Sequence, residues 1–225
     1  MKPGAWSYSS ITMFDNCPRR YQAEKVTKEI KFTDTDATIY GKDLHLAAEN
    51  YIGKGESIPP KFIFLQDILD RLNHIPGVKL CEYKMGIALR DGVFEPCDFF
   101  ASDAYWRGIA DLIIIDGDVA RCIDYKSGKS AKYADTKQLG LLAAAIFLHF
   151  PEVKVVKSGL LFVISGDFIK EEYTYERRFD IFAKLDPLLR QREIAYETDV
   201  WNPKPSGLCK RHCPVTSCPH NGANQ

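Results

Sequence analysis

The strongest constraint on the fold is a pair of apolar segments separated by a short polar turn. Residues 108–115 and 119–125 are rich in isoleucine and other side chains that favour β-strands, and the sequence Asp-Gly-Asp at 116–118 lies between them. An Asp-Gly step between two such segments is typical of a two-residue β-turn. The sequence therefore predicts a β-hairpin over residues 108–125.

This hairpin brings two acidic residues together. With a two-residue loop at 117–118, Asp111 lies directly opposite Asp124, with Cβ atoms about 5 Å apart. With the loop at 116–117 the pair is diagonal, at roughly 7 Å, but both carboxylates still lie on one face. Lys126 projects from that face too, because side chains alternate along a strand. Either register predicts two carboxylates and one ammonium group in one place.

Two carboxylates at this spacing repel each other unless a positive charge lies between them. Their hard oxygen atoms suit a divalent cation such as Mg²⁺. Lys126 could then orient or deprotonate a water molecule, or stabilise charge that develops during phosphodiester hydrolysis. The alternative is a structural hairpin whose polar face meets solvent, with Lys126 neutralising the aspartates.

Helices and strands predicted on both sides of the hairpin indicate an α/β domain with a mixed sheet flanked by helices. The chain has 225 residues, of which 45% are hydrophobic, which suits one domain with an appendage. We expect a domain over residues 1–200 and a cysteine-bearing tail over 201–225 that packs back on the N-terminal segment. The predicted helices are 9–14, 18–25, 38–54, 61–73, 135–150 and 180–197, and the predicted strands are 81–89, 108–115, 119–125, 155–164 and 169–177.

The charge balance limits how the chain can bind nucleic acid. Thirty basic and thirty acidic residues give no net charge, so any nucleic-acid site must be a local patch. The longest apolar run, 139–147, is too short to cross a bilayer, and the N-terminus lacks an apolar signal region, so we expect a cytoplasmic protein without membrane contacts. The candidate phosphate contacts are Arg19, Arg20, Lys129 and Lys132.

The sequence around the hairpin also resembles a known family. Gly108-Ile109-Ala110-Asp111 and Ile123-Asp124-Tyr125-Lys126 are similar to the motifs of the PD-(D/E)XK nuclease superfamily, in its branch of RecB-type exonucleases and CRISPR adaptation nucleases. The other segments that fit this branch, in the expected order, are residues 7–21, Gly41 with His45 and Glu49, Gln138, and the tail cysteines.

The resemblance implies a restriction-endonuclease-like fold and assigns roles to individual residues. It makes Lys126 catalytic and gives Gln138 the task of holding that lysine or a phosphate. The tyrosine that the family has four residues after this glutamine is replaced by Leu142. The metal ligands that it implies are His45, Asp111, Asp124 and the backbone carbonyl of Tyr125.

Two side chains near this site, His45 and Glu82, each have two possible interpretations. His45 is either a metal ligand or a partly buried histidine bonded to Glu49, four residues along the same helix. Glu82, on the polar face of the strand at 81–89, either supports the metal site from a neighbouring strand or is solvated. For Glu82 we favour solvation.

The resemblance implies a Mg²⁺- or Mn²⁺-dependent deoxyribonuclease of phage or prokaryotic type. We expect an exonuclease that acts on DNA ends or single strands in repair, recombination or phage DNA metabolism, with help from a replication or recombination protein. A phage-encoded enzyme would work in the host cytoplasm. The alternatives are a non-catalytic DNA- or partner-binding module of the same fold and a structure-specific endonuclease.

The chain has seven cysteines, and three of them lie in one ten-residue stretch of the tail, 209–218. In the family branch, tail cysteines join one near the N-terminus around a 4Fe–4S cluster, which here would use Cys17, Cys209, Cys213 and Cys218. The middle tail cysteine is shifted by one position, and His212 occupies the family's place. A zinc site that includes His212, or no metal at all, are the alternatives.

Overall fold

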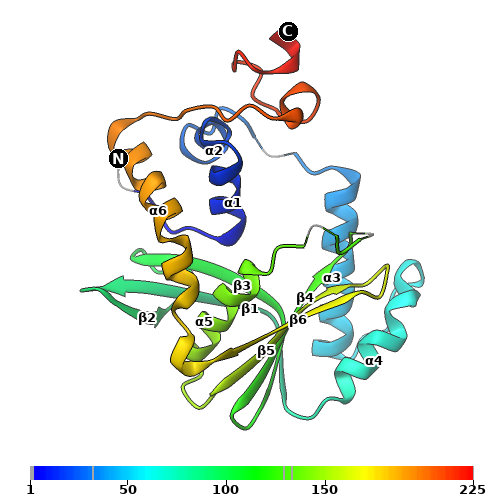
Figure 1. Ribbon diagram of the computed structural model, residues 1–225. Helices are drawn as coiled ribbons and strands as arrows, with labels where there is room; N and C mark the ends of the chain where they lie inside the picture. Colours follow the sequence, from blue (N-terminus) through cyan, green and yellow to red (C-terminus); the bar gives the residue numbers. More distant parts are fainter. Residues whose placement is uncertain (1–2, 32, 129, 133, 225) are drawn as a thin grey trace. The chain divides into compact units, whose positions relative to one another are not determined.

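The predicted hairpin forms the centre of a six-stranded mixed sheet in the computed structural model, which describes residues 3–31, 33–128, 130–132 and 134–224 (Figure 1). The strand order is β2-β1-β3-β4-β5-β6, with β4 and β5 parallel and the other neighbours antiparallel. Helices flank this sheet, which confirms the predicted fold class. The strands are β1 (Val78–Arg90), β2 (Val93–Cys97), β3 (Ala104–Asp116), β4 (Val119–Lys126), β5 (Val155–Phe162) and β6 (Phe168–Thr174).

The β3–β4 hairpin has the register of a two-residue loop. Asp116 pairs with Val119, and Gly117 in the loop has a φ of 61°, a conformation that glycine adopts without steric cost. The ladder ends at the pair of Leu112 and Ile123. Asp111 precedes Leu112 and Asp124 follows Ile123, so the two aspartates lie just beyond the last pair of the ladder.

The burial of β1 differs from the expectation for residues 81–89. The polar–apolar pattern predicts one buried face, but Met85–Ala88 are buried in succession, so both faces of β1 are covered there. The edge strand β2 has no counterpart among the predicted strands. Asp91 and Gly92, both with positive φ, form the tight turn that leads into β2.

Helices cover the two faces of the sheet within residues 34–181. Helices α3 (Asp36–Lys54) and α4 (Gln66–His74) pack on one face, where Leu44 and Leu69 contribute to a core that includes Leu112 and Tyr125 of the sheet. Helix α5 (Lys137–His149) packs on the other face through Leu139. The helix expected over 61–73 begins instead as a 3₁₀ helix, η2 (Pro60–Leu65).

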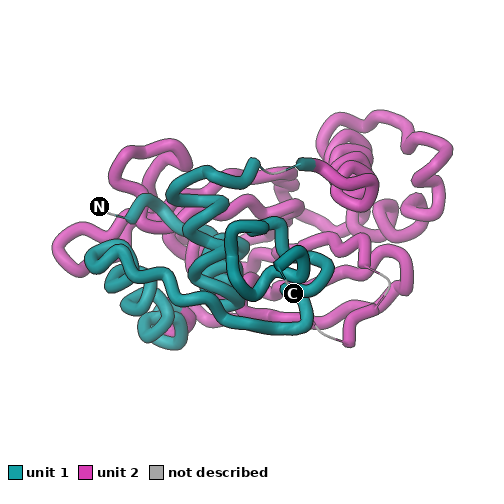
Figure 2. The backbone as a smooth tube through the Cα atoms, turned by 90° about the horizontal axis from the view of Figure 1, so that it is seen from above, with its two compact units in different colours: residues 1–33, 182–225 teal, residues 34–181 magenta. Residues whose placement is uncertain are grey.

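The chain divides into two compact units, residues 1–33 with 182–225 (unit 1) and residues 34–181 (unit 2) (Figure 2). In unit 1 the buried Arg192 donates hydrogen bonds to the Tyr21 hydroxyl and the Gly4 carbonyl, both at 2.8 Å, and thereby ties the two ends of the chain together. The domain boundary at residue 200 stays a prediction.

The remaining helices are α1 (Tyr8–Asn16), α2 (Pro18–Tyr21), the π-helix η1 (Gln22–Val26), η3 (Tyr175–Arg177), α6 (Asp180–Thr198), η4 (Gly207–Lys210) and η5 (Gly222–Asn224).

Of the helices that the structure describes, none combines the length and the apolar character needed to cross a membrane.

Helix α3 offers a matched test of the core. Leu44 is fully buried, whereas Leu46 on the same helix is 52% exposed. We expect Leu44→Ala to lower the free energy of unfolding by about 2–5 kcal/mol, because it leaves a cavity. Leu46→Ala should change it by less than about 0.5 kcal/mol. Urea unfolding measures both, and equal losses would contradict this packing.

Candidate active site

The candidate site lies where β1, β3 and β4 run side by side. Cys81 pairs with Leu112 and Tyr83 with Ala110, so Glu82 between them on β1 is level with Asp111 on β3. Glu82 has a φ of 47°, a conformation that non-glycine residues adopt rarely and often at functional sites. Three neighbouring strands therefore contribute acidic residues at one level of the sheet, because Asp124 of β4 follows the last pair of the hairpin.

Asp111 is held by contacts on both of its carboxylate oxygens. The backbone N–H of Tyr125 donates to Oδ2 at 2.6 Å, and Nδ1 of His45 lies 3.3 Å from Oδ1. The same imidazole nitrogen lies 3.7 Å from Glu82. The ligand atoms of His45, Glu82 and Asp111 all fall within 4.8 Å of one another. An imidazole and two carboxylates at this spacing can hold a metal ion.

The carboxylates beside His45 stabilise the charged form of its imidazole. Burial alone would lower its pKa, but hydrogen bonds to Asp111 and Glu82 raise the pKa to about 10. The alternative in which His45 bonds to Glu49 is wrong, since Glu49 lies 3.8 Å from Lys54 instead. A metal ion bound by this nitrogen would displace the proton.

Three side chains of β4 and α5 contact one another in pairs: Asp124, Lys126 and Gln138. The Lys126 ammonium lies 2.5 Å from Asp124 Oδ2 and donates to Gln138 Oε1 at 3.1 Å. The Gln138 amide in turn donates to Asp124 Oδ1 at 2.8 Å. Gln138 reaches both groups from the first turn of α5, as the sequence predicts.

Asp124 has an electrostatically unfavourable environment. It is 4% exposed, and burial together with the charge of Asp111 raises its pKa to about 6, against the opposing effect of Lys126. A divalent cation beside Asp111 and Asp124 would relieve this repulsion. The chemistry of the donor set and this repulsion both fit a divalent metal ion.

The structure brings together most of the residues that the sequence singled out. His45, Asp111, Asp124 and Lys126 lie in one site, and Glu82, which we expected to be solvated, contacts His45. The alternation of polar and apolar residues along β1 placed Glu82 on the polar face, but its backbone conformation gave no signal in the sequence. The role of the Tyr125 carbonyl as a ligand stays a prediction.

The predicted DNA contacts lie in different parts of the chain. Arg19 pairs with Glu29, and Arg20 pairs with Glu24, all within unit 1. Lys132 is exposed in the segment between β4 and α5. Lys129 lies outside the residues that the structure describes. The DNA-binding role of all four side chains stays a prediction.

The raised pKa of Asp124 predicts a pH-dependent stability. A carboxyl whose folded pKa lies above its unfolded value of 3.8 destabilises the folded state at high pH, and this cost disappears as the pH falls through about 6. In EDTA at pH 8, we expect Asp124→Asn to stabilise the protein by up to about 3 kcal/mol, with the gain shrinking towards pH 4. Thermal unfolding across this range measures the effect, with the exposed Asp118→Asn as control. A gain that does not depend on pH would contradict the assignment.

Comparisons with known proteins agree with this geometry. No curated protein matches the sequence. Among solved structures, SSO0001 is 17% identical, with a TM-score of 0.50 over 98% of this chain and 89% of that one. A "Putative exonuclease" from Eubacterium rectale is 13% identical, with a TM-score of 0.51 over 96% and 90%. These likenesses concern the fold. The model of the PD-(D/E)XK nuclease superfamily matches residues 5–219, and the chain belongs to this superfamily.

Proposed function

We propose that the protein is a Mg²⁺- or Mn²⁺-dependent deoxyribonuclease that removes nucleotides from DNA ends or single strands. The observation that carries this proposal is the alignment of Asp111 and Asp124 at the end of the β3–β4 ladder, with Lys126 beside them. A buried and a partly buried carboxylate with an adjacent ammonium group suit phosphodiester hydrolysis. His45 and Glu82 would complete the ligand set.

The side chains divide the chemistry between them. Asp111 and Asp124, with His45 and Glu82, would hold the metal ion, which when bound supplies positive charge for the phosphate and for an attacking water. Hydrolysis forms a new P–O bond from that water and breaks the bond to the leaving oxygen, which takes up a proton. The ammonium of Lys126 can orient the water or stabilise charge on the phosphoryl oxygens. Gln138 positions this ammonium through its hydrogen bond.

The choice of an exonuclease is supported by the fold shared with the Eubacterium rectale protein, which is described as a putative exonuclease. End-labelled linear DNA and closed circular DNA, each incubated with Mg²⁺ or Mn²⁺, test this choice. Degradation of linear DNA alone supports an exonuclease. Nicking of circles would favour a structure-specific endonuclease, and inertness of both would favour a binding module. The role in repair, recombination or phage DNA metabolism, the protein partner and the cytoplasmic location belong to this proposal.

We expect Asp111→Ala, Asp124→Ala and Lys126→Ala each to lower kcat by at least about 100-fold, because these groups act on the metal and the transition state. DNA affinity should change little. The matched controls are Asp118→Ala, in the exposed hairpin turn, and Lys157→Ala, whose ammonium lies at 3.9 Å from Glu172. Full wild-type activity in excess EDTA, or a parental rate for Asp124→Ala, would overturn the proposed site.

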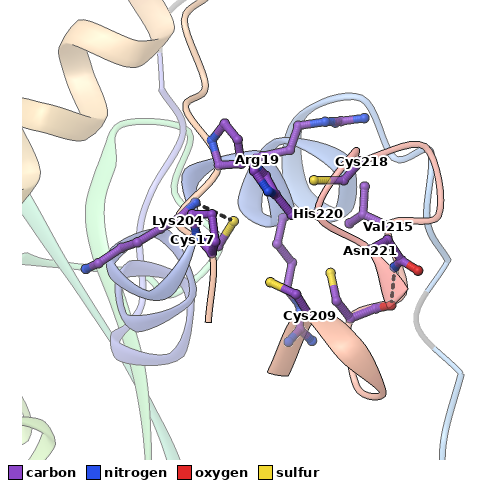
Figure 3. Close-up of a pocket in the computed structure, with 12 residues that line it drawn as sticks. Cys17, Arg19, Lys204, Cys209, Val215, Cys218, His220 and Asn221 are labelled. Atoms are coloured by element: carbon purple, nitrogen blue, oxygen red, sulfur yellow. Dashed lines mark hydrogen bonds between the residues drawn. The ribbon is translucent and has the colours of Figure 1, made fainter. Parts of the chain in front are cut away.

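The tail cysteines offer a second metal site, for which we propose a 4Fe–4S cluster. Cys17, Cys209, Cys213 and Cys218 line one small pocket in unit 1 (Figure 3). His220 lines this pocket, and His212, the ligand of our zinc alternative, does not. Four thiolates are the usual ligands of such a cluster.

Two backbone N–H groups point at sulfur atoms in this pocket. Lys204 N–H donates to Cys17 Sγ at 3.5 Å, and Ser206 N–H donates to Cys209 Sγ at 3.3 Å. Hydrogen bonds of this kind stabilise negative charge on thiolate sulfur and tune the potential of a cluster. These two donors fit the contacts expected around the sulfur ligands of a cluster.

Protein purified without oxygen should be brown and should contain about four iron and four sulfide atoms per chain. Cys17→Ala should remove most of this iron and colour, whereas Cys97→Ala, which alters a cysteine of β2 in unit 2, should keep both. Metal analysis and visible absorbance measure this. Colourless protein with one zinc ion per chain, or folded protein without metal, would refute the cluster.

A further inference from the structure

One face of β1 and β3 carries a row of side chains that begins beside the candidate active site. The register pairs Lys84 with Ile109 and Gly86 with Arg107. Met85, between Lys84 and Gly86, and Trp106, which precedes Arg107, are buried, and the alternation of side chains along a strand places them on the opposite face. Ile109 is 37% exposed and lies two residues from Asp111. Arg107 lies four residues from Asp111, about 13 Å away along the strand.

The loop after β2 is fixed on this same face. A Cβ at Gly86 would come within 2.7 Å of the Asp98 carbonyl oxygen, so only glycine allows the loop to approach β1 this closely. The Asp98 side chain accepts a hydrogen bond from the Phe100 N–H at 2.7 Å, and Arg107 donates to the Ala101 carbonyl at 2.8 Å. The loop therefore contacts the strands at two points and is braced by one internal hydrogen bond, while Phe100 remains 71% exposed.

Two cations accompany the aromatic side chains of this loop. Lys84 Nζ lies 5.7 Å from the centre of the Phe100 ring, and Arg107 Cζ lies 5.9 Å from that of Phe99. Neither cation forms an ion pair with any residue that the structure describes. The nearby carboxylates are engaged, since Asp98 bonds to the loop backbone and Asp103 pairs with Arg90.

We propose that Lys84, Phe100, Arg107 and Ile109 form a strand-binding row for unpaired nucleotides of the DNA substrate. A base stacks on the exposed Phe100 ring, and the phosphates beside it contact Lys84 and Arg107. The strand then passes over Ile109 to Asp111, where cleavage takes place. This inference rests on the proposed nuclease function and specifies the substrate as DNA with a single-stranded segment.

Charge and position together favour DNA over a protein partner. The row carries two positive charges, which suit the phosphates of a polyanion. It lies on the strands that carry Glu82 and Asp111 of the candidate active site. Stacking on an exposed ring requires an unpaired base, because the faces of bases inside a duplex are covered. Fully paired DNA should therefore use the row much less than single strands.

Binding is measured with the full chain carrying Lys126→Ala, in EDTA, on an oligo(dT) probe of about 20 nucleotides that contains one 2-aminopurine. Adding Phe100→Ala should weaken affinity between about 5- and 150-fold, which is the expected loss of one stacked base. It should also abolish quenching of 2-aminopurine fluorescence at one probe position, and Phe100→Trp should restore the quenching. The matched control is Phe64→Ala, which alters a phenylalanine of η2 that is 47% exposed.

The two cations are tested by salt dependence. Lys84→Ala and Arg107→Ala should each reduce the slope of log affinity against log salt concentration by about 0.7, the value for one phosphate contact on a single strand. Unchanged slopes together with unchanged affinity and quenching in Phe100→Ala would overturn the strand-binding row. A loss of similar size in Phe64→Ala would also overturn it.

Cleavage kinetics separate this inference from the function on which it rests. In the otherwise unaltered enzyme, Phe100→Ala should raise KM for the single-stranded probe by a larger factor than it changes kcat. If the wild-type protein cleaves DNA and the variant has the same KM, the strand-binding row is wrong and the nuclease stands. If the wild type cleaves no DNA but binds the probe in a Phe100-dependent way, the nuclease is wrong and the row stands as a binding surface.

Discussion

The repulsion between the carboxylates of Asp111 and Asp124 is the constraint on which the site depends. Asp111 and Asp124 lie where the β3–β4 ladder ends, and each needs its charge balanced by groups that the fold brings to it. Asp111 obtains a peptide N–H from Tyr125 and the imidazole of His45, and Asp124 obtains the ammonium of Lys126. Buried charges without such partners would destabilise the folded state strongly. A divalent cation at this site would complete the balance.

The helices on the two faces of the sheet supply the outer residues of this site. Helix α3 carries His45 and is anchored by Leu44, whereas α5 carries Gln138 and packs through Leu139. A side chain fixed on a packed helix holds its position more precisely than one on a loop. The same packing that stabilises unit 2 therefore orients the residues that we assign to catalysis.

The sequence was sufficient where local rules decide the structure. The Asp-Gly-Asp segment predicts the hairpin with two possible loops, and both place Asp111 and Asp124 on one face. The structure has the loop at 117–118. The sequence was insufficient where tertiary contacts decide. The edge strand β2 is not among the predicted strands, and the positive φ of Glu82, a residue that contacts His45, leaves no mark on the polar–apolar pattern. His220 lines the pocket of the tail cysteines, and the choice between a cluster, a zinc site with His212 and no metal stays a prediction.

The position of bound metal tests the central claim most directly. Crystals grown with Mn²⁺ and measured at the manganese absorption edge give the location of the ion by anomalous scattering. We predict a peak within coordination distance, about 2.0–2.4 Å, of carboxylate oxygens of both Asp111 and Asp124. A fully occupied Mn²⁺ site elsewhere on the protein, with these two carboxylates free of metal, would contradict the account.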